Sequence, residues 1–168
     1  MEVPSILLRP IRVEDNPVIA TIIRTVLTEF GANRPGTVFY DPTTDALFEL
    51  FMTPHSAYFI AEVDGCIAGG SGIFPTNGLP LGCCELVKLY LLPQYRGTGL
   101  GRKLIMACLE HAASQGFTSI YLETMPELNQ AKSLYEKCGF KYLEQAMGNS
   151  GHFGCDLWML KQISPENQ

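Results

Sequence analysis

The most informative part of the sequence is Leu89-Tyr90-Leu91-Leu92-Pro93-Gln94-Tyr95-Arg96-Gly97-Thr98-Gly99-Leu100-Gly101-Arg102. It joins an apolar, β-prone run, stopped by Pro93, to three alternating glycines and then to apolar residues at helical spacing. Without a Cβ, glycine lets an anion approach the backbone N–H groups at the positive end of a helix dipole. The stretch therefore predicts a strand, an anion-binding turn and a helix, with Arg96 and Arg102 adding positive charge.

The glycine spacing alone does not identify a ligand. A G-x-G-x-G turn also occurs where nothing binds, so a bare turn stays open. A Walker phosphate loop is excluded because Gly-Lys-Ser/Thr is missing, and a dinucleotide fold has its glycines after the first strand of a parallel array. Here they follow the fourth predicted strand. Another kind of phosphate- or nucleotide-binding module remains an alternative.

Hydrophobic periodicity and turn residues predict the remaining elements. An Asp64-Gly65 turn joins two apolar runs into an antiparallel hairpin. The predicted strands cover residues 6–11, 57–63, 66–74, 83–92, 117–122, 140–146 and 153–160. The predicted helices cover residues 17–30, 42–51, 99–114 and 129–138. This order indicates a mixed α/β (α+β) domain with helices on both faces of its sheet.

Composition limits the classes of protein to consider. The chain has 168 residues, 46% hydrophobic and 17% charged, which fits a single domain over 1–168. A net charge of −5 argues against a nucleic-acid partner, because such proteins usually carry a basic stripe. No apolar run approaches the roughly 20 residues that span a bilayer, and the N-terminus lacks a secretory pattern. We expect a cytoplasmic protein with no membrane partner, and leave a monomer and a homodimer open.

The cysteines and histidines do not suggest a metal site. Six cysteines lack C-x-x-C spacing, and we expect reduced thiols. Three histidines, His55, His111 and His152, are scattered without ligand spacing and receive no role. No metal is therefore expected.

Two motifs together resemble the GCN5-related N-acetyltransferase (GNAT) superfamily. Its coenzyme motif matches Arg96-Gly97-Thr98-Gly99-Leu100-Gly101; the frame starting at Gln94 also fits the six-residue pattern, but only the Arg96 frame sets the helix residues at the usual distance. Its second signature matches Ala131-Lys132-Ser133-Leu134-Tyr135-Glu136-Lys137-Cys138-Gly139-Phe140. The resemblance covers about 57–160, while 1–54 match only as a generic strand and helices. It implies a mostly antiparallel, seven-stranded sheet with a splayed central parallel pair.

The resemblance also implies a cosubstrate, acetyl-CoA, and residues that bind it. The turn from Arg96 to Arg102, including Thr98 and Leu100, would bind the pyrophosphate. Backbone groups of Leu89 and Leu91 would bind the pantetheine amides. The family expects an asparagine seven residues before the tyrosine of the second signature, where this chain has Leu128, so Asn129 is the candidate for that contact.

Two residues are candidates for proton transfer. Tyr135 matches the family tyrosine that protonates the departing thiolate. An amine with a pKa near 10.4 must lose a proton before it attacks, and a carboxylate can accept it. Glu85, on the strand before the pantetheine positions, is the preferred base, and Glu123 is its rival.

The resulting hypothesis is an N-acetyltransferase that passes acetyl directly to a primary amine of a small molecule or peptide. No cysteine has a nucleophile–base context, so no acyl-enzyme is expected. Residues 1–54 would form the acceptor side, and 57–160 the sheet core with the acetyl-CoA motifs. The alternative is a domain that binds acyl-CoA as a sensor without turnover.

Overall fold

The computed structural model describes residues 2–163, which form a seven-stranded sheet in the order β1-β2-β3-β4-β5-β7-β6. All neighbouring strands are antiparallel except β4 and β5. The strands are β1 (Ile6–Pro10), β2 (Ala57–Val63), β3 (Cys66–Phe74), β4 (Cys83–Leu91), β5 (Ser119–Thr124), β6 (Lys141–Leu143) and β7 (Leu157–Gln162). The predicted seven strands and the one parallel pair are confirmed.

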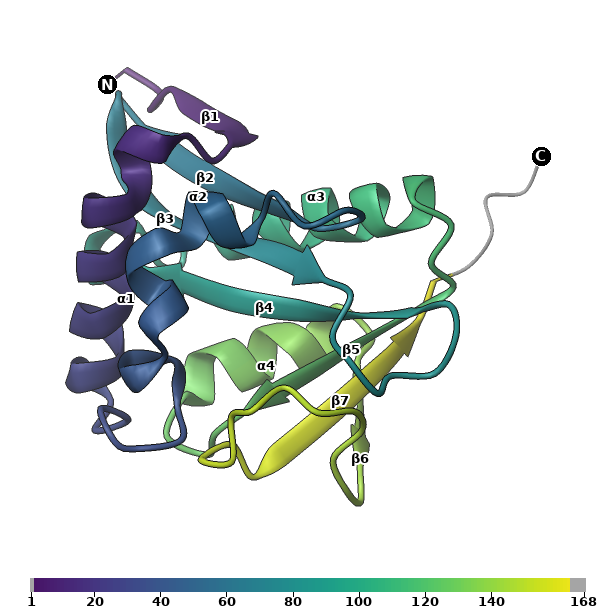
Figure 1. The fold of residues 1–168 in the computed structure, drawn as a ribbon. Coiled ribbons are helices and arrows are strands. Elements are labelled where there is room, and N and C mark those ends of the chain that lie inside the picture. Colours follow the sequence, from purple (N-terminus) through teal and green to yellow (C-terminus); the bar gives the residue numbers. More distant parts are fainter. Residues whose placement is uncertain (1, 164–168) are drawn as a thin grey trace.

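Four helices cover the two faces of the sheet (Figure 1). They are α1 (Asn16–Glu29), α2 (Leu47–Leu50), α3 (Leu100–Ser114) and α4 (Asn129–Lys137). The first two lie on one face, and α3 and α4 lie on the other. The predicted helix over 42–51 is only partly α-helical, because Pro42–Ala46 forms a 3₁₀ turn that leads into α2.

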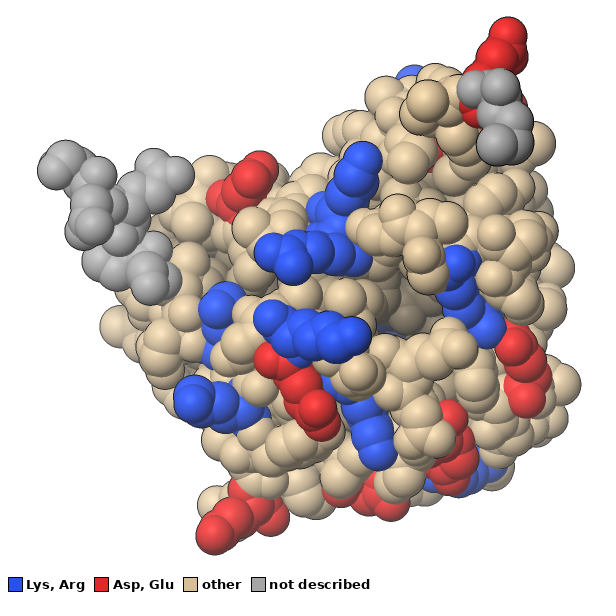
Figure 2. Space-filling model, turned by 180° about the vertical axis from the view of Figure 1, so that it is seen from behind, with Lys and Arg blue, Asp and Glu red and all other residues tan. Residues whose placement is uncertain are grey.

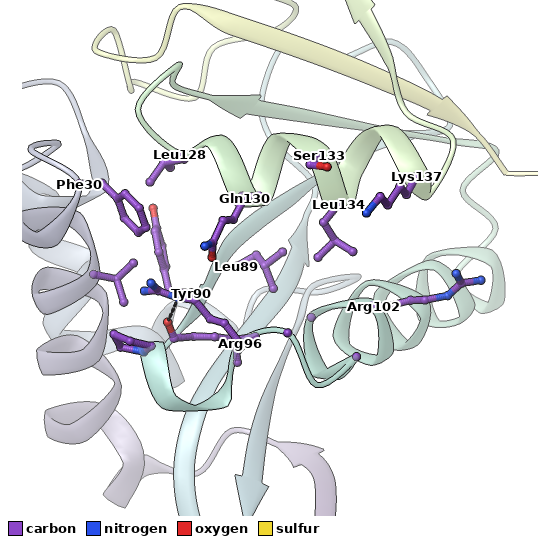
Figure 3. Close-up of a pocket in the computed structure, with 17 residues that line it drawn as sticks. Phe30, Leu89, Tyr90, Arg96, Arg102, Leu128, Gln130, Ser133, Leu134 and Lys137 are labelled. Carbon is purple, nitrogen blue, oxygen red and sulfur yellow. Dashed lines mark hydrogen bonds between the residues drawn. The ribbon is translucent and has the colours of Figure 1, made fainter.

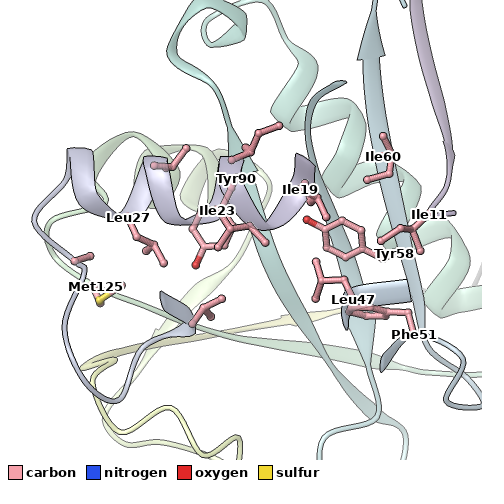
Figure 4. Close-up of a cluster of buried hydrophobic side chains, with 14 residues drawn as sticks. Ile11, Ile19, Ile23, Leu27, Leu47, Phe51, Tyr58, Ile60, Tyr90 and Met125 are labelled. Carbon is pink, nitrogen blue, oxygen red and sulfur yellow. The ribbon is translucent and has the colours of Figure 1, made fainter. Parts of the chain in front are cut away.

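The core on the α1 face is built from aromatic and branched side chains (Figure 4). Ile19, Ile23 and Leu27 recur along α1 at helical spacing and are fully buried. They pack with Tyr58 of β2 and Tyr90 of β4, which are also buried. This packing fixes α1 beside the middle of β4, where the strand leaves its parallel neighbour.

The parallel strands β4 and β5 separate after Glu85. Their pairing runs from Cys83↔Ser119 to Glu85↔Tyr121, whereas β4 stays paired with β3 as far as Gly69↔Leu91. The second half of β4 therefore has one free edge, as the splayed pair requires. The N–H of Leu92 points to β3, donating to the Ala68 carbonyl at 2.9 Å. Strand alternation then directs the backbone groups of Leu91 and Leu89 toward the free edge.

Two predicted strands near the C-terminus are wrong in extent. The strand expected over 140–146 is the three-residue β6, and the one expected over 153–160 begins only at Leu157. Backbone groups between β6 and β7 form hydrogen bonds with distant loops instead of with a neighbouring strand. The N–H of Asn149 donates to Asn77 at 2.7 Å, and that of Gly154 donates to Gly36 at 2.8 Å. In the part of the chain that the structure covers, no helix has the length and apolar composition needed to cross a bilayer.

Candidate active site

A large cavity of about 670 Å³ opens at the free edge of β4 (Figure 3). It lies between the start of α3, the inner side of α4 and the end of α1, and Phe30 closes its α1 side. Seven of the residues proposed from sequence line it: Leu89, Leu91, Arg96, Gly97, Gly99, Gly101 and Arg102. The splay of the sheet and the glycine turn therefore create one space.

Free backbone donors at the start of α3 make one end of this cavity suited to an anion. The first hydrogen bond of the helix runs from the Lys103 N–H to the Gly99 carbonyl at 3.1 Å. Within residues 2–163, nothing accepts from the N–H groups of Leu100, Gly101 or Arg102. These unpaired donors lie at the positive end of the helix dipole. They can bind a pyrophosphate.

The three glycines of the turn have different structural roles. Gly97 and Gly99 have φ angles of 74° and 83°, in the left-handed region that favours glycine. A Cβ on either would meet no atom within 4 Å, so their outer side is open to a ligand. A Cβ on Gly101 would lie 2.8 Å from Leu134 Cδ2 of α4. Gly101 thus allows α3 and α4 to approach closely.

Arg96 does not supply the free positive charge expected of it. Its guanidinium donates two hydrogen bonds to the Glu29 carboxylate, at 2.8 and 2.9 Å, and lies 5.0 Å from the centre of the Phe30 ring. Its Nε donates to the Leu91 carbonyl at 3.0 Å, as the dashed line in Figure 3 shows. Arg96 fixes the turn to α1 because Glu29 ends that helix beside it.

Other cations surround the cavity. Arg102 and Lys137 line it, and neither forms an ion pair with any described residue. Figure 2 shows Lys and Arg side chains grouped around a hollow on that face of the molecule. The net charge of the whole chain is negative and so does not reveal this local group of basic side chains. The group would attract a phosphorylated ligand.

Sequence reasoning missed the α4 side of this cavity. Gln130, Leu134 and Lys137 line it, and Figure 3 shows Gln130 and Leu134 projecting from α4 toward the turn. Their spacing of four and three residues puts them on one helix face, which is the signal that could have identified them. Val26 and Phe30 also lie four residues apart, at the end of α1, but their place beside the cavity depends on how α1 packs against the sheet.

Three of the proposed coenzyme residues do not line the cavity. Thr98 donates its hydroxyl to the Tyr95 carbonyl at 2.9 Å, and Leu100 is buried in the core with Leu104. Asn129, the first residue of α4, is exposed and lies outside the cavity lining, whereas Leu128 is part of it. The prediction that Asn129 replaces the missing asparagine contact has no geometric support.

A small cavity of about 50 Å³ lies along the same segment of β4. It shares Leu89, Tyr90 and Leu128 with the large cavity, so the two meet there. Its polar lining comprises Glu85, Lys88, Glu123, Thr124, Tyr135 and His152. Both proton-transfer candidates and the rival base therefore lie in one place, beside the splay.

Glu85 has the environment of a proton acceptor near neutral pH. It is 3% exposed, and its one hydrogen bond to a described residue comes from the Thr76 hydroxyl at 3.4 Å. Burial, helped by the charge of Glu123, raises its pKa to about 8. The rival Glu123 accepts from the Tyr121 hydroxyl at 2.8 Å and from the Ser150 hydroxyl. Glu85 therefore accepts fewer and longer hydrogen bonds than Glu123 does.

Tyr135 presents an unengaged hydroxyl. Its ring is 7% exposed and packs edge-on against Phe140 with centroids 5.9 Å apart. Within the described chain its hydroxyl makes no hydrogen bond, whereas the Tyr58 hydroxyl donates to the Lys88 carbonyl, and the Tyr121 hydroxyl donates to Glu123 and accepts from the Met147 N–H. Burial raises its pKa above the ordinary value, so it holds its proton at neutral pH and can donate it.

His152, which received no role from sequence, lies at the edge of this cavity and is hydrogen-bonded to Asp41. Its Nε2 is 2.8 Å from Oδ2 of Asp41, whose pKa is held low first by this contact. Lys88 Nζ is 3.9 Å from the same oxygen. No spacing could reveal the His152–Asp41 pair, because the two residues are 111 positions apart. Among residues 2–163, no group of three or more His, Cys, Asp or Glu side chains could hold a metal ion.

Comparison with known proteins agrees with this geometry. The profile of the Acetyltransferase (GNAT) family matches residues 23–140. YjgM of Escherichia coli (strain K12), an uncharacterized N-acetyltransferase, is 39% identical over 160 residues, which are 95% of this chain and 96% of YjgM.

Solved structures share the fold at low sequence identity. A GNAT-family acetyltransferase from Staphylococcus aureus Mu50 superposes with a TM-score of 0.83 at 16% identity, over 95% of this chain and 100% of its own. The yncA protein of Salmonella typhimurium, determined with acetyl-CoA, superposes with a TM-score of 0.74 at 20% identity, over 98% and 97% of the two chains.

Proposed function

Because this chain belongs to the acetyltransferase (GNAT) family, we propose that it transfers acetyl from acetyl-CoA directly to a primary amine of a small molecule or peptide. It is an acetyl-CoA-dependent N-acetyltransferase. One observation supports the acceptor class: the small cavity, at about 50 Å³, leaves room beyond the junction for a slender group such as an amine on a short chain. Residues 1–54 contribute Val38 and Asp41 to that side.

The large cavity fits acetyl-CoA as the donor substrate. The free N–H groups from Leu100 to Arg102 would bind the pyrophosphate, with Arg102 and Lys137 nearby. The pantetheine would lie along the free edge of β4 at Leu89 and Leu91, where the Leu91 carbonyl has a second lone pair beside its bond to Arg96. The thioester would then reach the junction at Leu89, Tyr90 and Leu128, where both cavities meet.

At the junction the acceptor amine would attack the thioester carbonyl. The ionised form of Glu85 would take a proton from the amine, and its raised pKa makes this carboxylate a stronger base than an exposed one. The N–C bond forms, the C–S bond breaks, and the Tyr135 hydroxyl supplies a proton to the departing thiolate. An N–H group near Leu91 would polarise the carbonyl during this step.

The test combines binding and turnover. Isothermal titration with coenzyme A, acetyl-CoA, ATP and NAD measures ligand preference, and thiol release measures transfer to a panel of primary amines. We expect tight binding of the two coenzyme A species only, and thiol release that depends on the amine. Binding without thiol release on any amine would favour the acyl-CoA sensor. Tighter binding of ATP or NAD would overturn the assignment of the large cavity.

A further inference from the structure

We propose that the acceptor carries a carboxylate besides its amine, as an amino acid does, and that the Lys88 ammonium binds this carboxylate in the small cavity. This acceptor class depends on the proposed function, because it names the substrate of the same reaction. Its basis is the hydrogen-bonding capacity that the described side chains leave unused around the cavity.

A bulge in β4 brings Lys88 to the same cavity as Glu85. In a regular strand, residues three positions apart point to opposite faces. Here Gly72 pairs with Val87 and Gly70 pairs with Tyr90, so Ser71 alone faces Lys88 and Leu89. Lys88 has a φ of 54°, unusual for a residue with a side chain, and its carbonyl accepts from the Tyr58 hydroxyl at 2.9 Å. The bulge therefore places Lys88, in a strained backbone conformation, in the lining of the small cavity.

The Lys88 side chain is buried, and its ammonium makes no hydrogen bond to any described residue. Its side chain is 4% exposed. Its ion pair within residues 2–163 is with Asp41, and the 3.9 Å between Nζ and Oδ2 exceeds hydrogen-bond distance. The ammonium has three N–H donors, and no described residue accepts a hydrogen bond from them. An anionic group of a bound ligand would satisfy them.

The carboxylates around Lys88 differ in how many hydrogen bonds they already accept. Asp41 already accepts from His152 and from the backbone N–H and hydroxyl of Thr43, at 2.8, 2.9 and 2.6 Å. Glu123 is engaged by Tyr121 and Ser150. Glu85 has only the 3.4 Å contact described above. Of these charged groups, the Glu85 carboxyl and the Lys88 ammonium therefore have unused hydrogen-bonding capacity.

An amino acid is complementary to this pair. Its amine can meet Glu85 while its carboxylate meets Lys88, and these two side chains form no ion pair with each other within 4.0 Å that would have to be broken. A diamine or polyamine has no acceptor to offer the Lys88 donors, whereas the carboxylate of an amino acid has. The unused groups therefore favour a zwitterionic acceptor over a dicationic one.

The test is calorimetric titration into the enzyme saturated with coenzyme A. The titrants are L-amino acids, their amides, the corresponding decarboxylated amines and diamines, and acetyl transfer to each is measured separately. A charge-assisted hydrogen bond should make the parent bind its best amino acid about 10- to 100-fold more tightly than that amino acid's amide. Lys88→Met should abolish this difference while still binding the amide. Lys141→Met, which removes an exposed lysine outside both cavities, should retain it.

Several outcomes would overturn the proposal. These are equal binding of amino acids and their amides by the parent, tighter binding of diamines, no binding of any amino acid, or an unchanged preference in Lys88→Met. If Lys88→Met does not fold, Lys88→Gln and the comparison of ligands on the parent decide. Amino acids that bind through Lys88 but are never acetylated would contradict the proposed function and leave the carboxylate site standing.

Discussion

Gly101 of α3 faces Leu134 of α4 so closely that a Cβ on the glycine would lie 2.8 Å from the leucine Cδ2 atom. This contact distinguishes Gly101 from Gly99, where an added Cβ would meet nothing within 4 Å but the φ of 83° disfavours any side chain. The sequence analysis assigns both glycines to the ligand-binding turn. In the structure, Gly101 also sets the distance between two helices.

Gly101→Ala should therefore lower the free energy of unfolding by about 1–3 kcal/mol through overpacking. Leu134→Ala should relieve part of that loss, because it removes the atom that the new Cβ meets. Gly99→Ala should cost about 1–2 kcal/mol through backbone strain, with no relief from Leu134→Ala. Denaturant unfolding of the single and double variants measures this coupling. Additive costs for Gly101→Ala and Leu134→Ala would contradict it.

Arg102 and Lys137 should attract the coenzyme phosphates, whereas Arg96 holds the turn. Arg102→Gln and Lys137→Gln should each weaken coenzyme A binding about two- to fivefold, because a partly exposed charge contributes about 0.3–1 kcal/mol. The effect should shrink at high salt. Lys141→Gln, outside the cavity, is the control. Titrations at two ionic strengths test this, and affinities within error of the parent at low salt would remove both residues from the site.

Tyr135→Phe should lower turnover by about 10² to 10⁴ and leave coenzyme A affinity unchanged. The ring would keep its packing against Phe140, while the proton donor would be lost. Single-turnover kinetics at saturating acetyl-CoA isolate the chemical step. Full activity in that assay would make Tyr135 structural and assign the thiolate proton to water.

Glu85 should make stability depend on pH. Its folded-state pKa of about 8 is above the ordinary 4.5, so between these values the folded protein holds a proton that the unfolded chain releases. Stability must then fall as pH rises through this window. Glu85→Gln should remove this contribution to the pH dependence of stability. The melting temperature of the variant, relative to that of the parent, should therefore rise from pH 5 to pH 8. A constant difference between the two would mean that Glu85 is not perturbed.

Local patterns in the sequence predict most of the fold and seven of the residues that line the large cavity. The Asp64-Gly65 hairpin, the glycine turn and the α3 periodicity depend on neighbouring residues and are confirmed. Contacts set by long-range packing could not be predicted. Arg96 meets Glu29 across 67 positions. Lys88 reaches the cavity of Glu85 only because a bulge reverses strand alternation, and a single sequence does not show where a bulge forms.

The most direct test of acetyl transfer with Glu85 as the base is the pH dependence of kcat/KM for the amine, compared between the parent and Glu85→Gln. The parent's advantage should grow as pH rises through about 8, where Glu85 becomes ionised. It should shrink again above the pKa of the acceptor, about 10.4 for a lysine-like amine, because the amine then arrives already neutral. Profiles that superimpose at every pH would contradict the role of Glu85 as the base in acetyl transfer.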